Sequence, residues 1–374
     1  MISCGEASGD LYAAALVRSL RAEVDDLEVF GFGGPRLAAE GADLASDYSR
    51  FAVTGLVEAL SVIPQSFRML RQLGDLARER RPDVFIAIDF PDFNFRLLPV
   101  MQRLGIPIVY YISPQLWAWR PGRIEQIRRY VSKMLVIFPF EVEVYEKAGV
   151  PVEFVGHPLI DLVNMPASRA EWLRAHGLDP DRPVVALLPG SRPNEIRLML
   201  PVMIEAVPRI EASVPGVQFV VARAPSLPDD LFAPAAAAGG RVRVVAEAAD
   251  AVLASADVVV TASGTATVQT ALHGRPMVIV YRLAWLSYAL GRAFVKLPFY
   301  GMVNLIAGRS VVPELIQQAC TAEAVHAETV SLLTDTARAT RMRADLAEVR
   351  GKLGAGGASG RAARAVLAVA RPRA

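Results

Sequence analysis

Residues 84–94, VFIAIDFPDFN, begin like a buried β-strand and end in polar side chains. The first five residues are all apolar, which is typical of a strand covered on both faces in a parallel sheet. Asp89, Asp92 and Asn94 then follow within six residues. Ligands of open α/β sheets bind at the carboxyl ends of the strands, so this one stretch indicates both a fold and a candidate site.

Similar apolar runs recur along the chain, separated by segments long enough for helices. They are 28–33, 84–88, 107–111, 134–138, 152–155, 184–188, 217–222, 241–245, 257–261 and 277–281. This alternation predicts an α/β fold with parallel sheets. The pattern pauses at 156–183, which is rich in proline and turn residues. We therefore expect two doubly wound, Rossmann-like domains that face each other across a cleft, at 1–163 and 164–345, and a helical tail at 346–374 that packs back on the N-terminal domain.

The composition is that of a globular chain. Its 374 residues exceed what one core usually organises, and 40 basic against 38 acidic side chains exclude a strongly cationic nucleic-acid binder. Cys4 and Cys320 form no CxxC pattern and there are only four histidines, so neither a disulfide scaffold nor a metal site is indicated. No secretory signal or membrane-spanning run is recognised. We expect a cytosolic protein that, if it meets membranes, touches them without crossing them.

Asp89 is the strongest candidate for chemistry in the opening stretch. Pro91 fixes the turn in which the acids lie, and helix capping alone would explain Asp92 or Asn94. Asp89 instead lies directly at the strand end, where it would face the cleft. A metal-binding pair of acids is the alternative, although no third ligand stands nearby in the sequence.

A Gly-bearing turn in LLPGSRPNEI, 187–196, has the composition of an anion site. Gly190 allows a tight turn, Ser191 can cap the following helix, and Arg192 stands beside the free backbone N–H groups of that helix. Helix N-termini and guanidinium groups both bind phosphate oxygens. An ordinary strand-to-helix turn with a solvated arginine would have the same spacing.

A second turn of the same design lies in TASGTATVQTAL, 261–272. Ser263, Gly264 and Thr265 would let a phosphate approach the backbone, and Gln269 lies one turn into the helix, within reach of a ribose. Two such turns in one domain favour a nucleotide diphosphate as the ligand. A third turn, GEASGD at 5–10, carries acids instead and suits a hydroxyl-rich ligand better than a phosphate.

Two further segments combine apolar and basic residues. In 113–129, Trp117 and Trp119 precede a series of arginines, a pattern that suits nucleic acids, sugar phosphates or a membrane interface, or else core tryptophans beside a solvated helix. The segment 53–73 has more apolar surface than a core helix needs and predicts an interfacial helix. Its expected membrane-contacting residues are Leu56, Ile63, Phe67, Arg68 and Arg71.

An ordered set of motifs is similar to one enzyme family. They include GEASGD at 5–10, IDFPDFNFRL at 88–97, YYISPQLWAWRPGRI at 110–124, FVGHPLID at 154–161, LLPGSRPNEI at 187–196, ASGTATVQTAL at 262–272 and LPFYGMVNLIAGR at 297–309. From residue 3 to about 320 the chain resembles lipid-A-disaccharide synthases. The resemblance implies the glycosyltransferase B architecture, with an acceptor-binding N-terminal domain and a C-terminal domain that binds a UDP-sugar.

The resemblance also implies the reaction and its partners. UDP-2,3-diacylglucosamine and 2,3-diacylglucosamine 1-phosphate would be joined by a β(1→6) linkage with release of UDP and without a metal or other cofactor. The enzyme would be cytoplasmic and peripherally associated with the anionic surface of the inner membrane, would bind no nucleic acid, and could form a homodimer. A UDP-sugar 2-epimerase of the same architecture and a non-catalytic nucleotide-binding module are the alternatives.

Site residues follow from the resemblance by position. Asp89 would be the general base. The nucleotide site would comprise Gly190, Ser191, Arg192, Ser263, Gly264, Thr265, Gln269, Asn304 and Arg309, and the acceptor site Glu6, Ser8, Asp92, Asn94 and Trp117. One position departs from the family pattern, since Gln269 stands where a glutamate is usual.

Overall fold

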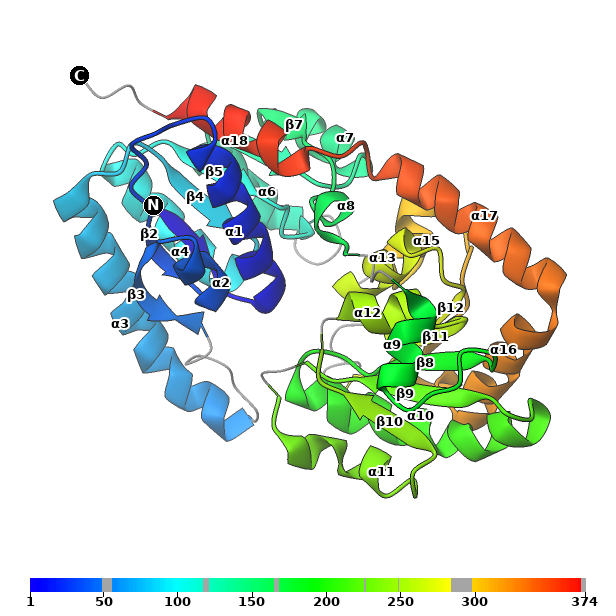
Figure 1. Cartoon of the computed structure of the whole chain (residues 1–374). Helices are drawn as coiled ribbons and strands as arrows, with labels where there is room; N and C mark the ends of the chain where they lie inside the picture. Colours follow the sequence, from blue (N-terminus) through cyan, green and yellow to red (C-terminus); the bar gives the residue numbers. More distant parts are fainter. Residues whose placement is uncertain are drawn as a thin grey trace. The chain divides into compact units, whose positions relative to one another are not determined.

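The computed structural model describes residues 1–48, 56–116, 121–164, 168–224, 227–247, 249–283 and 298–370. The chain forms two compact units. Unit 1 comprises Met1–Asp161 together with Leu353–Ala374, and unit 2 comprises Leu162–Lys352 (Figure 1). Each unit is an α/β domain built on its own parallel sheet, so the predicted fold class is confirmed.

Unit 1 contains a seven-stranded parallel sheet in the order β3-β2-β1-β4-β5-β6-β7. The strands are β1 Ile2–Cys4, β2 Phe30–Gly33, β3 Asp43–Asp47, β4 Phe85–Ile88, β5 Ile108–Tyr111, β6 Lys133–Val136 and β7 Val152–Phe154. The helices are α1 Ala7–Arg21, α2 Pro35–Ala39, α3 Leu56–Arg80, α4 Pro91–Arg103, η2 Pro121–Arg123, α6 Ile124–Tyr130, α7 Phe140–Lys147, α8 Leu159–Leu162 and α18 Ala358–Val369. The strand order reverses between β1 and β4, which places the switch point of the sheet at their carboxyl ends.

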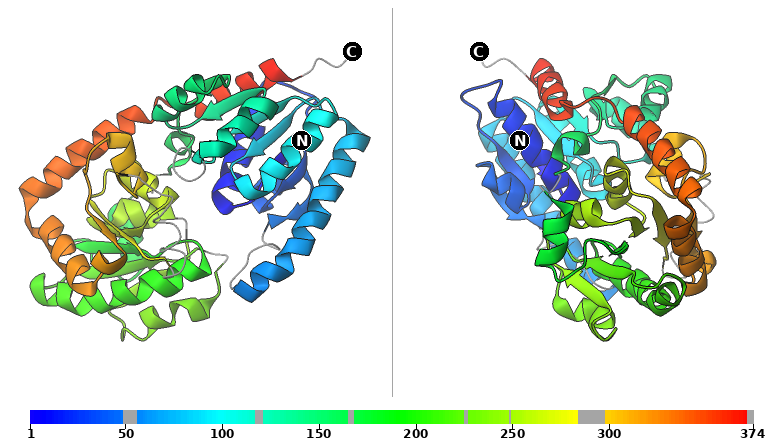
Figure 2. Two further views of the ribbon diagram at one scale, coloured as in Figure 1. Left: turned by 180° about the vertical axis from the view of Figure 1, so that it is seen from behind. Right: turned by 45° about the vertical axis from the view of Figure 1, so that its right-hand side comes forward.

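The two faces of this sheet are covered by different helices. Phe85 and Tyr110 belong to an apolar core that also contains Met69 and Leu73 of α3 and Leu97 of α4. On the other face α18 packs against α1 and β5 (Figures 1 and 2). Successive residues of a strand point to opposite faces, so each strand serves both layers.

The end of the chain returns to unit 1 through a glycine-rich bend. Gly354 and Gly357 have φ values of +92° and +82°, a conformation that glycine adopts readily. The carboxylate of Asp161 accepts hydrogen bonds from the backbone N–H groups of Gly357 (2.8 Å) and Ala358 (3.0 Å), and so caps α18. The sequence predicted one tail from 346, whereas α17, Thr336–Lys352, lies in unit 2 and only the chain from Leu353 lies in unit 1.

Unit 2 contains a six-stranded parallel sheet in the order β10-β9-β8-β11-β12-β13. The strands are β8 Val184–Leu188, β9 Gln218–Ala222, β10 Val242–Val245, β11 Val258–Ala262, β12 Met277–Tyr281 and β13 Glu314–Ile316. The helices besides α17 are α9 Arg169–Ala175, α10 Pro193–Ser213, η3 Asp229–Phe232, α11 Ala233–Ala236, α12 Ala249–Ser255, α13 Thr265–Leu272, α15 Met302–Ala307, η4 Gln317–Ala319 and α16 Ala322–Thr334. Here the order reverses between β8 and β11.

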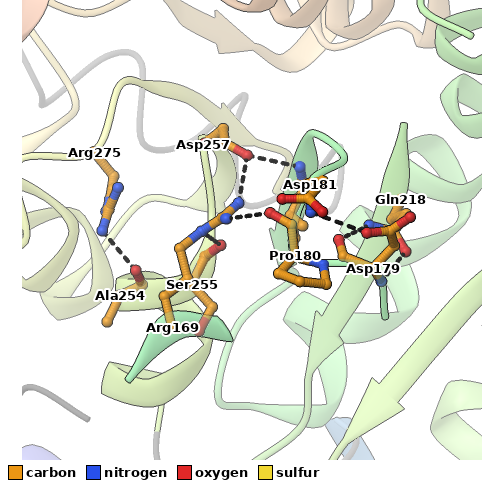
Figure 3. A network of polar contacts seen from close by, with 10 residues as sticks. Arg169, Asp179, Pro180, Asp181, Gln218, Ala254, Ser255, Asp257 and Arg275 are labelled. Carbon is orange, nitrogen blue, oxygen red and sulfur yellow. Dashed lines mark hydrogen bonds and ion pairs between the residues drawn. The ribbon is translucent and has the colours of Figure 1, made fainter. Parts of the chain in front are cut away.

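A polar network secures the beginning of unit 2 (Figure 3). The Arg169 guanidinium donates to the Asp257 carboxylate (2.9 Å) and to the backbone carbonyls of Pro180 (2.8 Å) and Ser255 (3.0 Å). The same Asp257 carboxylate accepts from the backbone N–H of Val184 at 2.8 Å, at the start of β8. The network therefore lies at the amino ends of β8 and β11, and leaves their carboxyl ends to the site.

The sequence did not predict β3 and β13. Both are outermost strands of their sheets. β3 has the sequence DLASD and its residues are half-buried or exposed, while β13 has only three residues. An edge strand is covered less than a central one, so it can form without an apolar run, as these two do, whereas the other outermost strands, β7 and β10, keep one.

Candidate active site

Asp89 lies at the switch point of the unit 1 sheet, in an unusual backbone conformation. Its backbone N–H donates to the carbonyl of Tyr111 at 3.2 Å, which extends the pairing of β4 with β5 by one residue. Asp89 and Phe90 then have φ values of +44° and +49°. Two successive non-glycine residues in the left-handed region are costly, and such strain concentrates at functional sites.

Non-glycine residues with a left-handed backbone conformation are concentrated at this edge of the sheet. Of the six non-glycine residues with positive φ in the described ranges, four follow β4 or β5: Asp89, Phe90, Ile112 and Gln115. Most of the left-handed non-glycine residues of unit 1 thus lie at the carboxyl ends of two neighbouring strands, where the sequence analysis expects the general base.

The turn after β1 is shaped by the aromatic ring of Phe90. A Cβ atom added to Gly5 would lie 2.3 Å from that ring, so only glycine fits there. Phe90 also stacks on Phe93 with 5.3 Å between the ring centroids. The turn that follows β1 therefore meets the turn that carries Asp89, with the half-buried Glu6 and Ser8 directly after Gly5.

The acid that closes GEASGD has a structural role. Asp10 is buried and accepts hydrogen bonds from the backbone N–H groups of Gly34 (2.9 Å), Arg36 (3.0 Å) and Leu37 (3.0 Å). These groups belong to the N-terminus of α2, which lacks a side-chain cap of its own. The expectation that both acids of this turn suit a hydroxyl-rich ligand is therefore wrong for Asp10, because its oxygens are engaged.

Asn94 and Asp92 differ in their surroundings. Asn94 is completely buried; its Oδ1 accepts from the Ser3 hydroxyl at 2.7 Å and its Nδ2 donates to the carbonyl of Asp89 at 2.7 Å. This amide supports Asp89 from within the fold and does not present itself to an acceptor. Asp92 is exposed and forms an ion pair with Arg123 at 2.9 Å. Trp117 lies outside the described residues.

In the Gly-bearing turn at 190–192, a carboxylate of the protein itself occupies the predicted anion site. Glu195 Oε2 accepts from the backbone N–H groups of Ser191 (2.9 Å) and Arg192 (3.3 Å), and Oε1 lies 3.4 Å from the Arg192 guanidinium. Gly190, at φ +127°, makes room for this carboxylate, because a Cβ there would lie 2.4 Å from Oε2. The backbone N–H groups that the sequence analysis took as free are therefore occupied.

The helix cap also differs from the prediction. The N-cap of α10 is Arg192 and not Ser191, and the Glu195 carboxylate, three residues later, accepts from the backbone N–H of Arg192. Glu195 stands four residues after Ser191 and not three, so the spacing of a serine capping box did not identify it in the sequence. Close by, at the end of β12, burial raises the pKa of Tyr281, and the Glu195 carboxylate raises it further.

The second turn of unit 2 is more open. Gly264, at φ +151°, is exposed, and a Cβ atom added there would have no other atom within 4 Å. Thr265 begins α13 and is exposed, Ser263 donates to the carbonyl of Tyr300 at 3.1 Å, and Gln269 is half-buried one turn later. This turn follows β11, the neighbour of β8, so the two turns lie at the ends of adjacent strands.

Asn304 is engaged inside unit 2. It is completely buried; Oδ1 accepts from the N–H groups of Val311 (2.7 Å) and Val312 (3.0 Å), and Nδ2 donates to the Val312 carbonyl and to Glu314. Four hydrogen bonds use the full capacity of an amide. Asn304 therefore braces the segment before β13 and cannot contact a nucleotide in this arrangement.

Arg309, the last residue of the motif LPFYGMVNLIAGR that also contains Asn304, has partners within the protein. It pairs with Asp345 at 3.0 Å and with Glu348 at 2.6 Å, both on α17. A direct contact with a phosphate would require Arg309 to leave these two carboxylates.

Across the described ranges, no group of three or more His, Cys, Asp or Glu side chains is placed to hold a metal ion. The helices in those ranges include none that is both long and apolar enough to cross a bilayer.

Solved structures with similar folds include an epimerase and a glycotransferase. A putative UDP-N-acetylglucosamine 2-epimerase from Listeria monocytogenes has a TM-score of 0.68 at 15% identity, covering 98% of this chain and 94% of that one. The glycotransferase of kitacinnamycin has a TM-score of 0.65 at 21% identity, covering 99% and 98%. At these identities the likeness establishes the fold alone.

Sequence relatives are much closer. The family model described as lipid-A-disaccharide synthetase matches residues 1–369. The lipid-A-disaccharide synthase of Geobacter metallireducens is 46% identical over 368 residues, covering 98% of this chain and 96% of the relative. That of Myxococcus xanthus is 43% identical over 373 residues, covering 100% and 97%. The chain therefore belongs to the lipid-A-disaccharide synthetase family.

Proposed function

We propose that Asp89 is the general base of an inverting glycosyl transfer, in which 2,3-diacylglucosamine passes from UDP to the 6-hydroxyl of 2,3-diacylglucosamine 1-phosphate. Membership of the family makes the chain a lipid-A-disaccharide synthase, which is a glycosyltransferase. The observation that carries the assignment of Asp89 is its place directly after β4, at the switch point of the sheet and in a strained conformation.

The stereochemistry of the reaction requires a base. The acceptor oxygen bonds to the anomeric carbon from the face opposite UDP, the bond from that carbon to the β-phosphate oxygen breaks, and the hydroxyl proton passes to the Asp89 carboxylate. UDP leaves with an additional negative charge. Positive charge and backbone N–H groups placed at the diphosphate stabilise that charge as it develops.

In unit 2, the diphosphate would lie against the turns at 190–192 and 263–265. Support comes from the open space at Gly264 and from the adjacency of β8 and β11. Arg192 supplies the positive charge, and Gln269 lies near enough to the turn to contact the ribose. Because Glu195 holds the backbone N–H groups of the first turn, nucleotide binding would displace its carboxylate or use the second turn alone.

Helix α3 supplies the membrane-contacting surface in this proposal. Met69, Leu73 and Ala77 turn one side of it into the core, whereas Phe67 is 47% exposed. Arg68 and Arg71 are exposed on the same helix and line a shallow hollow beside β3. Apolar area and basic residues together favour an anionic membrane surface, on the cytoplasmic side of the inner membrane, from which diacylated substrates can be drawn.

A product assay tests the proposal directly. Purified protein is incubated with both diacylated substrates, and mass spectrometry should detect the disaccharide 1-phosphate while a coupled assay detects UDP. Asp89→Asn should lower both signals about 10²–10⁴-fold. If the protein instead converts UDP-N-acetylglucosamine without an acyl acceptor, it is an epimerase, and if UDP binds while no product forms, it is a binding module.

A further inference from the structure

The main-chain carbonyl of Asp89 is held by two buried side chains. The Tyr110 hydroxyl donates to it at 2.8 Å, and Asn94 Nδ2 donates to it at 2.7 Å. Both side chains are completely buried. A carbonyl oxygen has two lone pairs, so these two donors satisfy it fully.

The two donors come from different elements. Tyr110 lies on β5, opposite Ala87 of β4, and Asn94 lies in the first turns of α4. Asn94 is itself fixed, because its Oδ1 accepts from the hydroxyl of Ser3 on β1 at 2.7 Å. The carbonyl of Asp89 is therefore tied directly to β5 and α4, and through Asn94 to β1.

Tyr110 is suited to remain a donor. Burial raises the pKa of its hydroxyl well above the ordinary value, and the negative charge of Asp89 raises it further. The hydroxyl thus keeps its proton throughout the pH range in which the carboxylate works as a base.

We propose that Tyr110 and Asn94 are positioning residues for the reaction. By donating to the main-chain carbonyl of Asp89, they hold Asp89 and Phe90 in the left-handed conformation that orients the Asp89 carboxylate. The inference rests on the proposed role of Asp89 as base. Neither side chain touches a reacting atom. They act through the main chain, because the left-handed region is unfavourable for both residues and persists only where surrounding bonds enforce it.

The matched pair Tyr110→Phe and Tyr111→Phe tests the idea. Both tyrosines are completely buried neighbours on β5, and each substitution removes one hydroxyl. Tyr111 does not belong to the α3–α4 core that contains Tyr110, and its strand contacts α18 on the other face. Tyr110→Phe should lower kcat about tenfold, the factor for one net hydrogen bond, with KM for both substrates within about twofold, whereas Tyr111→Phe should leave kcat unchanged.

A double-mutant cycle separates positioning from general stability. In the Asp89→Asn background, which lacks the base, Tyr110→Phe should cause no further fall in kcat. Equal losses of kcat in both backgrounds, or equal losses from Tyr110→Phe and Tyr111→Phe, would mean that the hydroxyl serves only the fold. Wild-type kcat in Tyr110→Phe would also overturn the proposal.

Asn94→Leu offers an independent variant of nearly the same size. It removes the donor to the Asp89 carbonyl without introducing an ionisable group into a completely buried site, so kcat should fall at least as far as in Tyr110→Phe while the affinity for UDP stays constant. A normal kcat in folded Asn94→Leu would refute the inference. The failure of Asp89 itself as base is recognised separately, because Asp89→Asn would then turn over normally.

Discussion

Asparagine and alanine at position 89 probe the chemistry and the backbone of the candidate base separately. Both substitutions remove the carboxylate, so both should lower kcat by about 10²–10⁴-fold, the range for a positioned general base. UDP affinity should change little in either variant, since Asp89 lies in unit 1 and the nucleotide turns lie in unit 2. Catalysis alone therefore does not distinguish the two variants.

Their stabilities should differ, because Asp89 has φ +44°. Asparagine tolerates the left-handed region as aspartate does, whereas for other L-residues that conformation costs roughly 1–2 kcal/mol. Asp89→Ala should therefore lower the free energy of unfolding of unit 1 by about 1 kcal/mol more than Asp89→Asn. For a domain of this size, that difference corresponds to about 2–4 °C in Tm.

Steady-state kinetics with mass detection and differential scanning calorimetry measure the two effects. Asp26 provides the control pair, since it is exposed and its φ is not positive. Asp26→Asn and Asp26→Ala should match each other in kcat and in Tm. Turnover near the wild-type rate in Asp89→Asn would refute the general base, and equal Tm values for Asp89→Asn and Asp89→Ala would refute the strain argument.

Three further variants test the nucleotide turns and α3. Glu195→Ala should lower the free energy of unfolding by about 0.5–2 kcal/mol through loss of the helix cap, yet bind UDP more tightly in calorimetric titration if the diphosphate uses the same N–H groups; weaker binding would contradict this. Gln269→Glu should tighten UDP by about 1 kcal/mol, because a carboxylate accepts both ribose hydroxyls more strongly, and 2′-deoxy-UDP should gain less; an equal gain would exclude the ribose contact. Phe67→Ser should reduce the amount of protein that sediments with anionic vesicles, and vesicle binding by the wild type should fall as salt rises. Tyr300→Ser removes the other large exposed hydrophobic side chain of the described residues and should leave vesicle binding unchanged.

The central strands were predictable because a strand that is buried on both faces consists of a continuous run of apolar residues. The run at 184–188 coincides with β8, and the run at 84–88 differs from β4 by one residue. The position of Asp89 was predictable for the same reason, since the first polar residue after a central strand lies at the edge where α/β proteins bind ligands, and its role as base stays a proposal.

The supporting polar residues could not be assigned in this way. Asn94 and Asn304 belong to motifs that contain site residues, and a linear motif does not tell a residue that contacts a ligand from one that braces its neighbour. Asn304 is separated by several residues from the backbone groups it holds at 311–312, and only the folded turn brings them together. Tyr110 belongs to an apolar run in the sequence because its ring packs in the core. Its hydroxyl reaches the carbonyl of Asp89 only because β5 pairs with β4.

The composition of unit 1 from two distant parts of the chain has a consequence for its biosynthesis. When Met1–Asp161 has left the ribosome, α18 has not been made, so α1 and β5 still lack the helix that covers them. Translation of Leu162–Lys352 delays that helix by on the order of ten to forty seconds. Unit 2 is continuous, and its last residue is made at the end of that interval, before α18. The domain encoded first is therefore completed last, and a nascent chain must protect the apolar surface around α1 until its final helix arrives.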